Sequence, residues 1–262
     1  MTALRQSYVH GASDQPLIGD TIGRYFDAAC THWAERPALI VRHQGVRLTY
    51  GELRAAVDRL AAGLVSLGLE KGDRIGIWSP NNGEWVLTQF ATAKAGLILV
   101  NINPAYRTAE LEYALNKVAC KALILAERFK TSDYLGMLGE LAPELGRATP
   151  GALEAARLPR LRAVIVIGET APPGTLRFAD VASRGGTVEA ETLAALAPKL
   201  QFDEAINIQF TSGTTGYPKG ATLSHHNILN NGFFVGEAMR LGPEDRLCIP
   251  VRQKAHEARH AP

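Results

Sequence analysis

The chain has 262 residues, of which 46% are hydrophobic and 21% charged, a composition that excludes general disorder and predicts one or two globular domains. Its formal net charge is only +2, from 28 basic and 26 acidic residues, so it lacks the positive bias that favours nucleic-acid binding. No apolar run approaches the roughly 18 residues of a membrane span, and the N-terminus shows no apolar signal segment. Together with three unpaired cysteine positions, these features predict a cytoplasmic location, no transmembrane segment and no nucleic-acid partner.

The first predicted elements follow a polar leader at residues 1–20. Apolar residues then recur on one face of a helix that starts near Thr21 and ends before Pro37, and a short strand follows over 38–42. A second helix opens with the T-x-x-E pattern of a capping box, and Gly68 fits its C-terminal glycine cap. Its apolar stripe comprises Leu53, Val57, Leu60, Leu64 and Leu67.

Strand and helix signals alternate from residue 74 onward. Strands are predicted at 74–78, 97–101, 122–125, 163–167 and 206–210, with helices over 84–95 and from Thr108. Short apolar strands separated by amphipathic helices are typical of a mostly parallel sheet with helices on both faces, so the fold class is α/β. The stretch 140–205 is the least regular, because prolines and the pair Gly185-Gly186 interrupt it repeatedly.

A loop rich in glycine and hydroxyl residues follows the strand 206–210. It reads T-S-G-T-T-G-Y-P-K-G over 211–220. Its glycines let backbone N–H groups approach an anion, its threonines and serine add hydroxyl donors, and Lys219 adds a positive charge suited to a polyphosphate. The Walker A pattern does not fit, because Gly220 rather than serine or threonine follows the lysine. The alternative is an ordinary Gly/Thr turn, but the density of matched residue types favours a phosphate-binding loop.

This loop resembles the signature of the adenylate-forming (AMP-binding) superfamily. Further segments resemble that superfamily in order, namely L-T-Y-G-E-L at 48–53, L-G-L-E-K-G-D-R-I-G-I-W at 67–78, N-N-G-E-W at 81–85 and N-I-N-P-A-Y-R-T-A-E-L-E-Y at 101–113. The resemblance runs from about Thr21 to Val251 and is nearest to bacterial medium- or long-chain fatty-acyl-CoA synthetases. It implies the incomplete large N-terminal domain of the adenylate-forming fold.

The resemblance also implies a reaction. ATP activates a carboxylic (fatty) acid as acyl-AMP with release of pyrophosphate, and coenzyme A then takes the acyl group as a thioester. The residues expected to contact the β- and γ-phosphates, with Mg²⁺ bridging phosphate oxygens, are Thr211, Ser212, Gly213, Thr214, Thr215, Gly216, Lys219 and Gly220. No catalytic residue and no protein metal ligand is assigned, because the later motifs of the superfamily cannot be located.

The family pattern changes abruptly at Arg252. We interpret 21–251 as an incomplete N-terminal AMP-binding domain and 252–262 as a non-family basic tail, and we hypothesise that a frameshift or premature stop produced this tail. Such a chain is expected to be inactive alone, with the missing C-terminal part supplied, if at all, on a separate chain. Without that part, Leu53, Val57, Leu60 and Leu64 are expected to be poorly covered.

Other interpretations stay open. A non-catalytic ATP-binding or interaction module that retains the fold is the main alternative, and an inert product is a third. His225-His226, and His256 with His260 near Cys248, offer a weak metal-site pattern, for which surface histidines are the simpler explanation.

Overall fold

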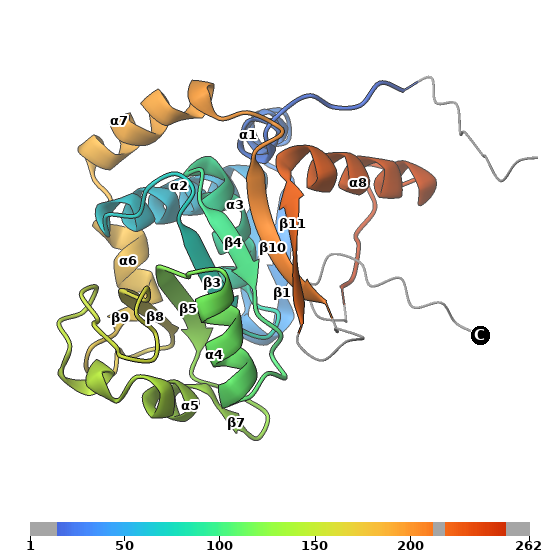
Figure 1. The fold of residues 1–262 in the computed structure, drawn as a ribbon. Helices are drawn as coiled ribbons and strands as arrows, with labels where there is room; N and C mark the ends of the chain where they lie inside the picture. Colours follow the sequence, from blue (N-terminus) through green and yellow to red (C-terminus); the bar gives the residue numbers. More distant parts are fainter. Residues whose placement is uncertain (1–14, 212–217, 250–262) are drawn as a thin grey trace, which may run out of the picture.

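The computed structural model describes residues 15–211 and 218–249, and a seven-stranded sheet forms its centre (Figure 1). The strands lie in the order β11-β10-β4-β3-β5-β8-β9, and every neighbouring pair is parallel except β10 and β11. Their bounds are β3 Arg74–Trp78, β4 Ile98–Asn101, β5 Ala122–Ala126, β8 Ala163–Ile167, β9 Leu176–Arg177, β10 Ala205–Thr211 and β11 Lys219–Ser224. Helices cover both faces of the sheet, which confirms the predicted α/β class.

The inner strands are almost wholly apolar because both of their faces are buried. Strand β5 (ALILA) and strand β8 (AVIVI) show this most clearly. Successive side chains point to opposite faces, so Leu123 and Leu125 enter one core while Ala122 and Ile124 enter the other. The sheet therefore separates two hydrophobic cores, one under each layer of helices.

One face is covered by four helices, α1 Ile22–His32, α2 Tyr50–Ser66, α3 Gly83–Lys94 and α6 Phe178–Arg184. The capping box predicted at the start of α2 is present. The Glu52 backbone N–H donates to Thr49 Oγ1 at 3.2 Å, and the Thr49 N–H donates to the Glu52 carboxylate at 2.8 Å. These two bonds satisfy donors that the first turn of the helix leaves unpaired, and so they set where α2 begins.

The expectation that the apolar stripe of α2 would be poorly covered is wrong. Leu53 is 4% exposed, and Val57, Leu60 and Leu64 are completely buried. The cover comes from within the described residues, because α2 packs against the sheet, α3 and α6. Helix α6 approaches so closely that a Cβ on Gly63 would lie 1.8 Å from the Val181 carbonyl oxygen. The sequence pattern does not predict this contact, because α6 lies in the stretch 140–205 that prolines and glycines interrupt.

The opposite face is covered by α4 Thr108–Lys117 and α5 Tyr134–Leu141, followed by the 3₁₀ turn Pro143–Arg147. At the centre of this core the rings of Trp78 and Tyr134 stack with centroids 3.8 Å apart, and both side chains are fully buried. Tryptophan and tyrosine carry polar atoms that need partners when buried. Those partners are backbone carbonyls of the segment after β4, as described below.

The remaining elements lie around this framework. They are the hairpin β1 Pro37–Val41 and β2 Val46–Thr49 with the 3₁₀ turn Arg42–Gln44, the hairpin β6 Arg128–Phe129 and β7 Ser132–Asp133, α7 Thr187–Leu196, the 3₁₀ turn Ala197–Lys199, and α8 His225–Ala238. Helix α7 lies outside α2, and α8 lies beside the β10–β11 edge (Figure 1). In the part of the chain that the structure describes, no helix combines the length and apolar character needed to cross a bilayer.

Candidate functional site

Strands β10 and β11 form an antiparallel hairpin whose connecting loop carries the predicted phosphate-binding residues. The register pairs Phe210 with Gly220 and Thr211 with Lys219, so the two ends of the loop lie side by side. The Thr211 hydroxyl donates to the Lys219 carbonyl oxygen at 3.4 Å, a long hydrogen bond across the mouth of the hairpin. The loop therefore begins and ends at one point on the edge of the sheet.

Three of the eight predicted site residues lie in the described part of the chain, namely Thr211, Lys219 and Gly220. The other five lie outside the described residues: Ser212, Gly213, Thr214, Thr215 and Gly216. Thr211 and Lys219 are exposed, and no carboxylate among the described residues pairs with the Lys219 ammonium. Its charge is thus available to an anionic ligand at the mouth of the hairpin.

Gly220 lies where the hairpin is tightest. A Cβ at this position would approach Ile208 Cγ2 to 3.2 Å and the Phe210 ring to 3.6 Å. Both of those side chains belong to the buried core under the sheet. A larger residue would require the neighbours to shift by a few tenths of an ångström, so glycine lets β11 lie close against the strand that leads into the loop.

The mouth of the hairpin lies at the carboxyl edge of the sheet, where the parallel strands end at Trp78, Asn101, Ala126 and Ile167. Ligands of open α/β sheets bind outside this edge, where the direction of strand order reverses. Here the order β4-β3-β5 makes such a reversal beside β3, close to the strand pair β4–β10. The topology thus places the predicted loop on the edge that this fold class uses for ligands.

The buried aromatic pair fixes the segment that follows β4 at this edge. The Trp78 Nε1–H donates to the Asn103 carbonyl oxygen at 3.2 Å, and the Tyr134 hydroxyl donates to the Pro104 carbonyl oxygen at 2.6 Å. Each bond satisfies the polar atom of an otherwise apolar side chain. The two rings therefore hold the turn between β4 and α4 in a single position.

Beside that turn lies a cavity of about 240 Å³ with two cationic side chains among its lining residues, Arg107 and Lys130. Ser132, which is 8% exposed, also lines it. The Lys130 ammonium lies 5.4 Å from the centroid of the Phe129 ring. No carboxylate of the described residues forms an ion pair with either cation, so the cavity is suited to an anion.

A pair of buried amides joins β4 to β10. Asn101 Nδ2 donates to Asn207 Oδ1 at 3.3 Å, while Asn101 Oδ1 and Asn207 Nδ2 have no hydrogen-bond partner among the described residues. Asn207 is only 1% exposed. An orphaned donor and an orphaned acceptor are costly in a protein interior. This pair lies on the strand that leads into the loop, and the sequence analysis missed it because each asparagine stands alone within an apolar strand.

His225 is buried and has a structural role, so the expectation of a surface histidine is wrong at this position. His225 is 1% exposed, and its Nδ1 accepts a hydrogen bond of 3.1 Å from the Ile22 backbone N–H at the start of α1. Burial lowers its pKa to about 4, against the opposing effect of the Glu204 carboxylate. Within the described ranges, no three histidine, cysteine or carboxylate side chains form a group that could hold a metal ion, while His256 and His260 lie outside them.

The mostly parallel sheet with helices on both faces defines an α/β domain of the doubly wound class. The family model described as AMP-binding enzyme matches residues 26–253, and the chain therefore belongs to the AMP-binding enzyme family. This membership confirms the resemblance that the loop and the segments at 48–113 indicated.

Comparison with individual proteins gives the same class. The chain is 46% identical over 251 residues to the mitochondrial medium-chain acyl-CoA ligase ACSF2 of Mus musculus. The aligned region covers 93% of this chain and 40% of that protein. The ACSF2 of Homo sapiens is 49% identical with the same coverage. Among solved structures, acetoacetyl-CoA synthetase from Streptomyces lividans aligns with a TM-score of 0.70 at 28% identity, over 86% of this chain and 33% of that chain. The chain thus spans about two fifths of the curated relatives it matches.

Proposed function

We propose that this chain is the ATP-binding portion of a fatty-acyl-CoA ligase that acts on medium-chain acids. In the proposed reaction the carboxylate attacks the α-phosphate of ATP to give acyl-AMP and pyrophosphate, and the thiol of coenzyme A then displaces AMP. The observation that carries this proposal is the β10–β11 hairpin, which presents Thr211 and Lys219 at the carboxyl edge of the sheet, with no ion pair to Lys219 from the described residues. The names of the two ACSF2 relatives support the acid-thiol ligase type and the medium chain length.

The residues at the mouth of the hairpin fit a polyphosphate. An exposed ammonium and an exposed hydroxyl are 8 positions apart in sequence but paired in register. They can hold adjacent phosphate oxygens when the Thr211 hydroxyl turns from its long hydrogen bond with the Lys219 carbonyl to the ligand. Lys219 would offset the negative charge that develops on the pyrophosphate leaving group. It would also reduce the repulsion between the triphosphate and the attacking carboxylate. The loop residues outside the described ranges, Ser212 to Gly216, are proposed to add backbone and hydroxyl donors.

Mg²⁺ is proposed to bind through phosphate oxygens. The described residues offer it no cluster of carboxylates, so phosphate oxygens and the loop hydroxyls are the ligands that fit. When bound, the metal would neutralise phosphate charge. The described residues then have the separate task of orienting the triphosphate, which Lys219 and Thr211 perform from the two ends of the loop.

Coenzyme A is proposed to place part of its phosphate-bearing half in the 240 Å³ cavity. Arg107 and Lys130 line that cavity without ion-pair partners among the described residues, and it lies at the carboxyl edge, beside the turn that follows β4. A charge-reversing Lys130→Glu variant is expected to weaken coenzyme A binding without changing ATP binding. Equal weakening of both ligands would contradict a separate acceptor site.

The ATP proposal is tested by direct binding. The triple variant Lys219→Ala, Thr214→Ala, Thr215→Ala should lose protection by Mg-ATP against limited proteolysis, with Lys199→Ala as the control. Lys199 is exposed in the 3₁₀ turn after α7 and makes no ion pair with another described residue, so the control removes an equal charge elsewhere. If the triple variant is protected as well as the wild-type chain, the phosphate site is not at this loop.

A non-catalytic ATP-binding or interaction module is the alternative function, since the chain spans only 40% of its relatives. The two are distinguished by adding the remaining C-terminal region of an ACSF2 relative as a separate chain. Release of pyrophosphate that depends on a fatty acid would support the ligase, whereas ATP binding with no pyrophosphate release would support the module.

The domain layout and location are also proposals. We propose a leader at 1–20, the AMP-binding domain at 21–251 and a separate tail at 252–262, and limited proteolysis followed by mass spectrometry tests these boundaries. We also propose a cytoplasmic location, which cell fractionation tests. Recovery of the chain in the mitochondrial fraction would contradict it, and the two ACSF2 relatives are described as mitochondrial.

A further inference from the structure

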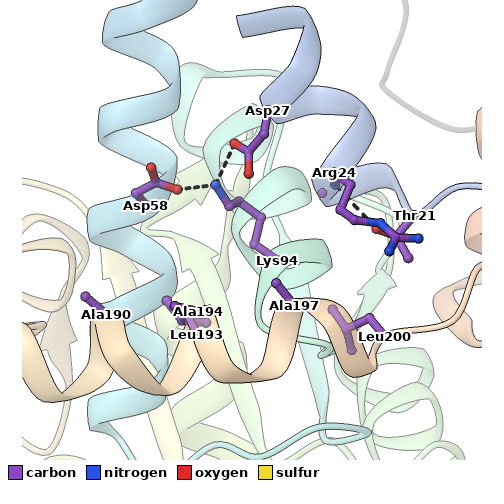
Figure 2. Close-up of a pocket in the computed structure, with 11 residues that line it drawn as sticks. Thr21, Arg24, Asp27, Asp58, Lys94, Ala190, Leu193, Ala194, Ala197 and Leu200 are labelled. Carbon is purple, nitrogen blue, oxygen red and sulfur yellow. Dashed lines mark hydrogen bonds and ion pairs between the residues drawn. The ribbon is translucent and has the colours of Figure 1, made fainter. Parts of the chain in front are cut away.

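A cavity of about 280 Å³ lies between α7 and the helices α1, α2 and α3 (Figure 2). Its lining includes Leu200, which lies just before β10, whereas the predicted phosphate loop follows the far end of that strand. A strand of seven residues spans roughly 20 Å, so the cavity is separate from the ATP site. It therefore poses a question that the proposed ligase function does not answer.

On the side of α1, α2 and α3, the cavity is lined by an ion-pair network. Lys94 Nζ lies 2.7 Å from Asp27 Oδ1 and also pairs with Asp58, as the dashed lines in Figure 2 show. Arg54 Nε lies 3.2 Å from the same oxygen of Asp27. Arg24 lines the cavity as well, but its guanidinium is paired with Asp20 at 2.6 Å. Each charged side chain that lines the cavity thus already has a partner of opposite sign.

The roof is apolar. Helix α7 and the turn after it present Ala190, Leu193, Ala194 and Ala197 at spacings of three and four residues, and Leu200 completes this surface. Although these residues form one face of the helix, α7 contains no buried residue. An apolar surface therefore faces charged side chains across a space that no side chain fills. Water solvates the charged side but not the apolar side, so a ligand that covers the apolar surface would be favoured.

Close contacts hold both ends of α7. At the N-terminal side, a Cβ on Gly185 would lie 2.3 Å from the Ala62 Cβ, so the chain there already touches α2. At the C-terminal side, Leu200 is 3% exposed and its Cδ2 would lie 2.9 Å from a Cβ on Gly96. Leu193 in the middle of α7 also packs against the core that includes α2, so three points hold the helix beside the cavity.

The lining defines the ligand that fits. Two cations and two carboxylates line the cavity, Arg24 and Lys94 against Asp27 and Asp58, so the lining carries no net charge. A charged ligand would have to break existing ion pairs at a cost in desolvation. A hydroxyl group instead donates to a carboxylate oxygen and accepts from the ammonium, leaving the pairs intact. We propose that this cavity binds a small neutral alcohol, with its hydroxyl on the Lys94 network and its aliphatic chain against α7.

The test uses three ligands with the same chain and different head groups, namely 1-hexanol, hexanoate and hexylammonium, titrated into ¹⁵N-labelled protein. Binding of 1-hexanol should shift α7 and α1 amide signals, with an affinity at least about tenfold above that of either ion, because only the ions must break ion pairs. Equal or tighter binding of hexanoate or hexylammonium would overturn the proposal, as would the absence of shifts with all three.

A matched pair of variants on α7 locates the site. Ala194→Phe fills the cavity and should weaken 1-hexanol binding by about tenfold or more, while Ala195→Phe, on an exposed position that does not line it, should leave affinity within about twofold. Ala190→Leu serves as a second cavity-filling variant if Ala194→Phe fails to fold. Equal affinity in the filling and control variants would place the alcohol elsewhere and reject the proposal. Mg-ATP protection in all of them separates this outcome from failure of the ATP proposal.

Discussion

Helix α2 and strand β11 represent two regions of this chain with opposite surroundings. Leu53, Val57, Leu60 and Leu64 of α2 are at most 4% exposed between the sheet, α3 and α6, whereas the first four residues of β11, starting at Lys219, are all exposed. The difference shows that packing on several sides holds α2, whereas the hairpin leaves its polar groups accessible to a ligand.

The largest expected effect comes from two helical glycines. Gly63→Ala should destabilise the chain by at least about 3 kcal/mol, because its Cβ would lie 1.8 Å from the Val181 carbonyl oxygen and would push α6 off α2. Gly139→Ala, in α5, meets nothing within 4 Å and should stabilise by up to about 1 kcal/mol. Urea unfolding followed by circular dichroism measures both. Similar stability in the two variants would show that α2 and α6 are not in close contact.

Acid should weaken the link between α8 and α1. In the unfolded chain His225 takes up a proton near pH 6.5, whereas burial lowers its pKa to about 4 in the folded chain. The neutral His225 side chain therefore contributes fully to the free energy of unfolding above pH 6.5. As the pH falls from 6.5 to 4 this contribution is lost, and the free energy of unfolding decreases by up to about 3 kcal/mol.

The control for this effect is His225→Asn, which keeps an acceptor for the Ile22 N–H but does not titrate. The wild-type chain should lose more stability than this variant between pH 7 and pH 4.5, as measured by thermal unfolding. Parallel pH profiles would show that the histidine is accessible to protons in the folded chain.

The amide pair on the strand that leads to the loop should behave non-additively. Asn207→Leu alone should destabilise by about 1–3 kcal/mol, because Asn101 then loses its hydrogen-bond partner on β10 while its amide stays buried. The double variant Asn101→Leu, Asn207→Leu removes both orphaned atoms of this pair and should recover most of that loss. A double-mutant cycle from melting curves measures the coupling, and simple additivity would mean that the two amides act independently.

The last prediction concerns the reactivity of the three thiols, and no change in stability is expected from it. Burial raises the pKa of Cys30 to about 11 and that of Cys120 to about 12, while Cys248 is exposed after α8. At pH 8 one thiol should react quickly with Ellman's reagent, and the other two should react only on unfolding. Replacement of Cys248 by serine should abolish the fast phase, and its persistence would mean that the α2 or β5 layer opens readily.

Much of the fold was predictable because local patterns agreed with the tertiary structure. The strand at 74–78 and the helix begun by Thr108 are observed with the predicted bounds or starts, and the T-x-x-E capping box at Thr49 makes both of its hydrogen bonds. The elements α6 and α7 were not predicted, because prolines and glycines interrupt the pattern of 140–205 and their helices are short. The burial of the α2 stripe was therefore predicted wrongly, since α6 supplies part of its cover.

The sequence by itself determined the α/β class, the family and the position of the Gly/Thr signature at 211–220, because those depend on short-range spacing of glycine, hydroxyl and apolar residues. Only the tertiary structure decided which residues from distant segments meet. It joined Asn101 to Asn207, His225 to the start of α1, and α7 to the Lys94 network. Such contacts depend on how strands and helices are ordered around the sheet, and no local pattern in the chain encodes that order.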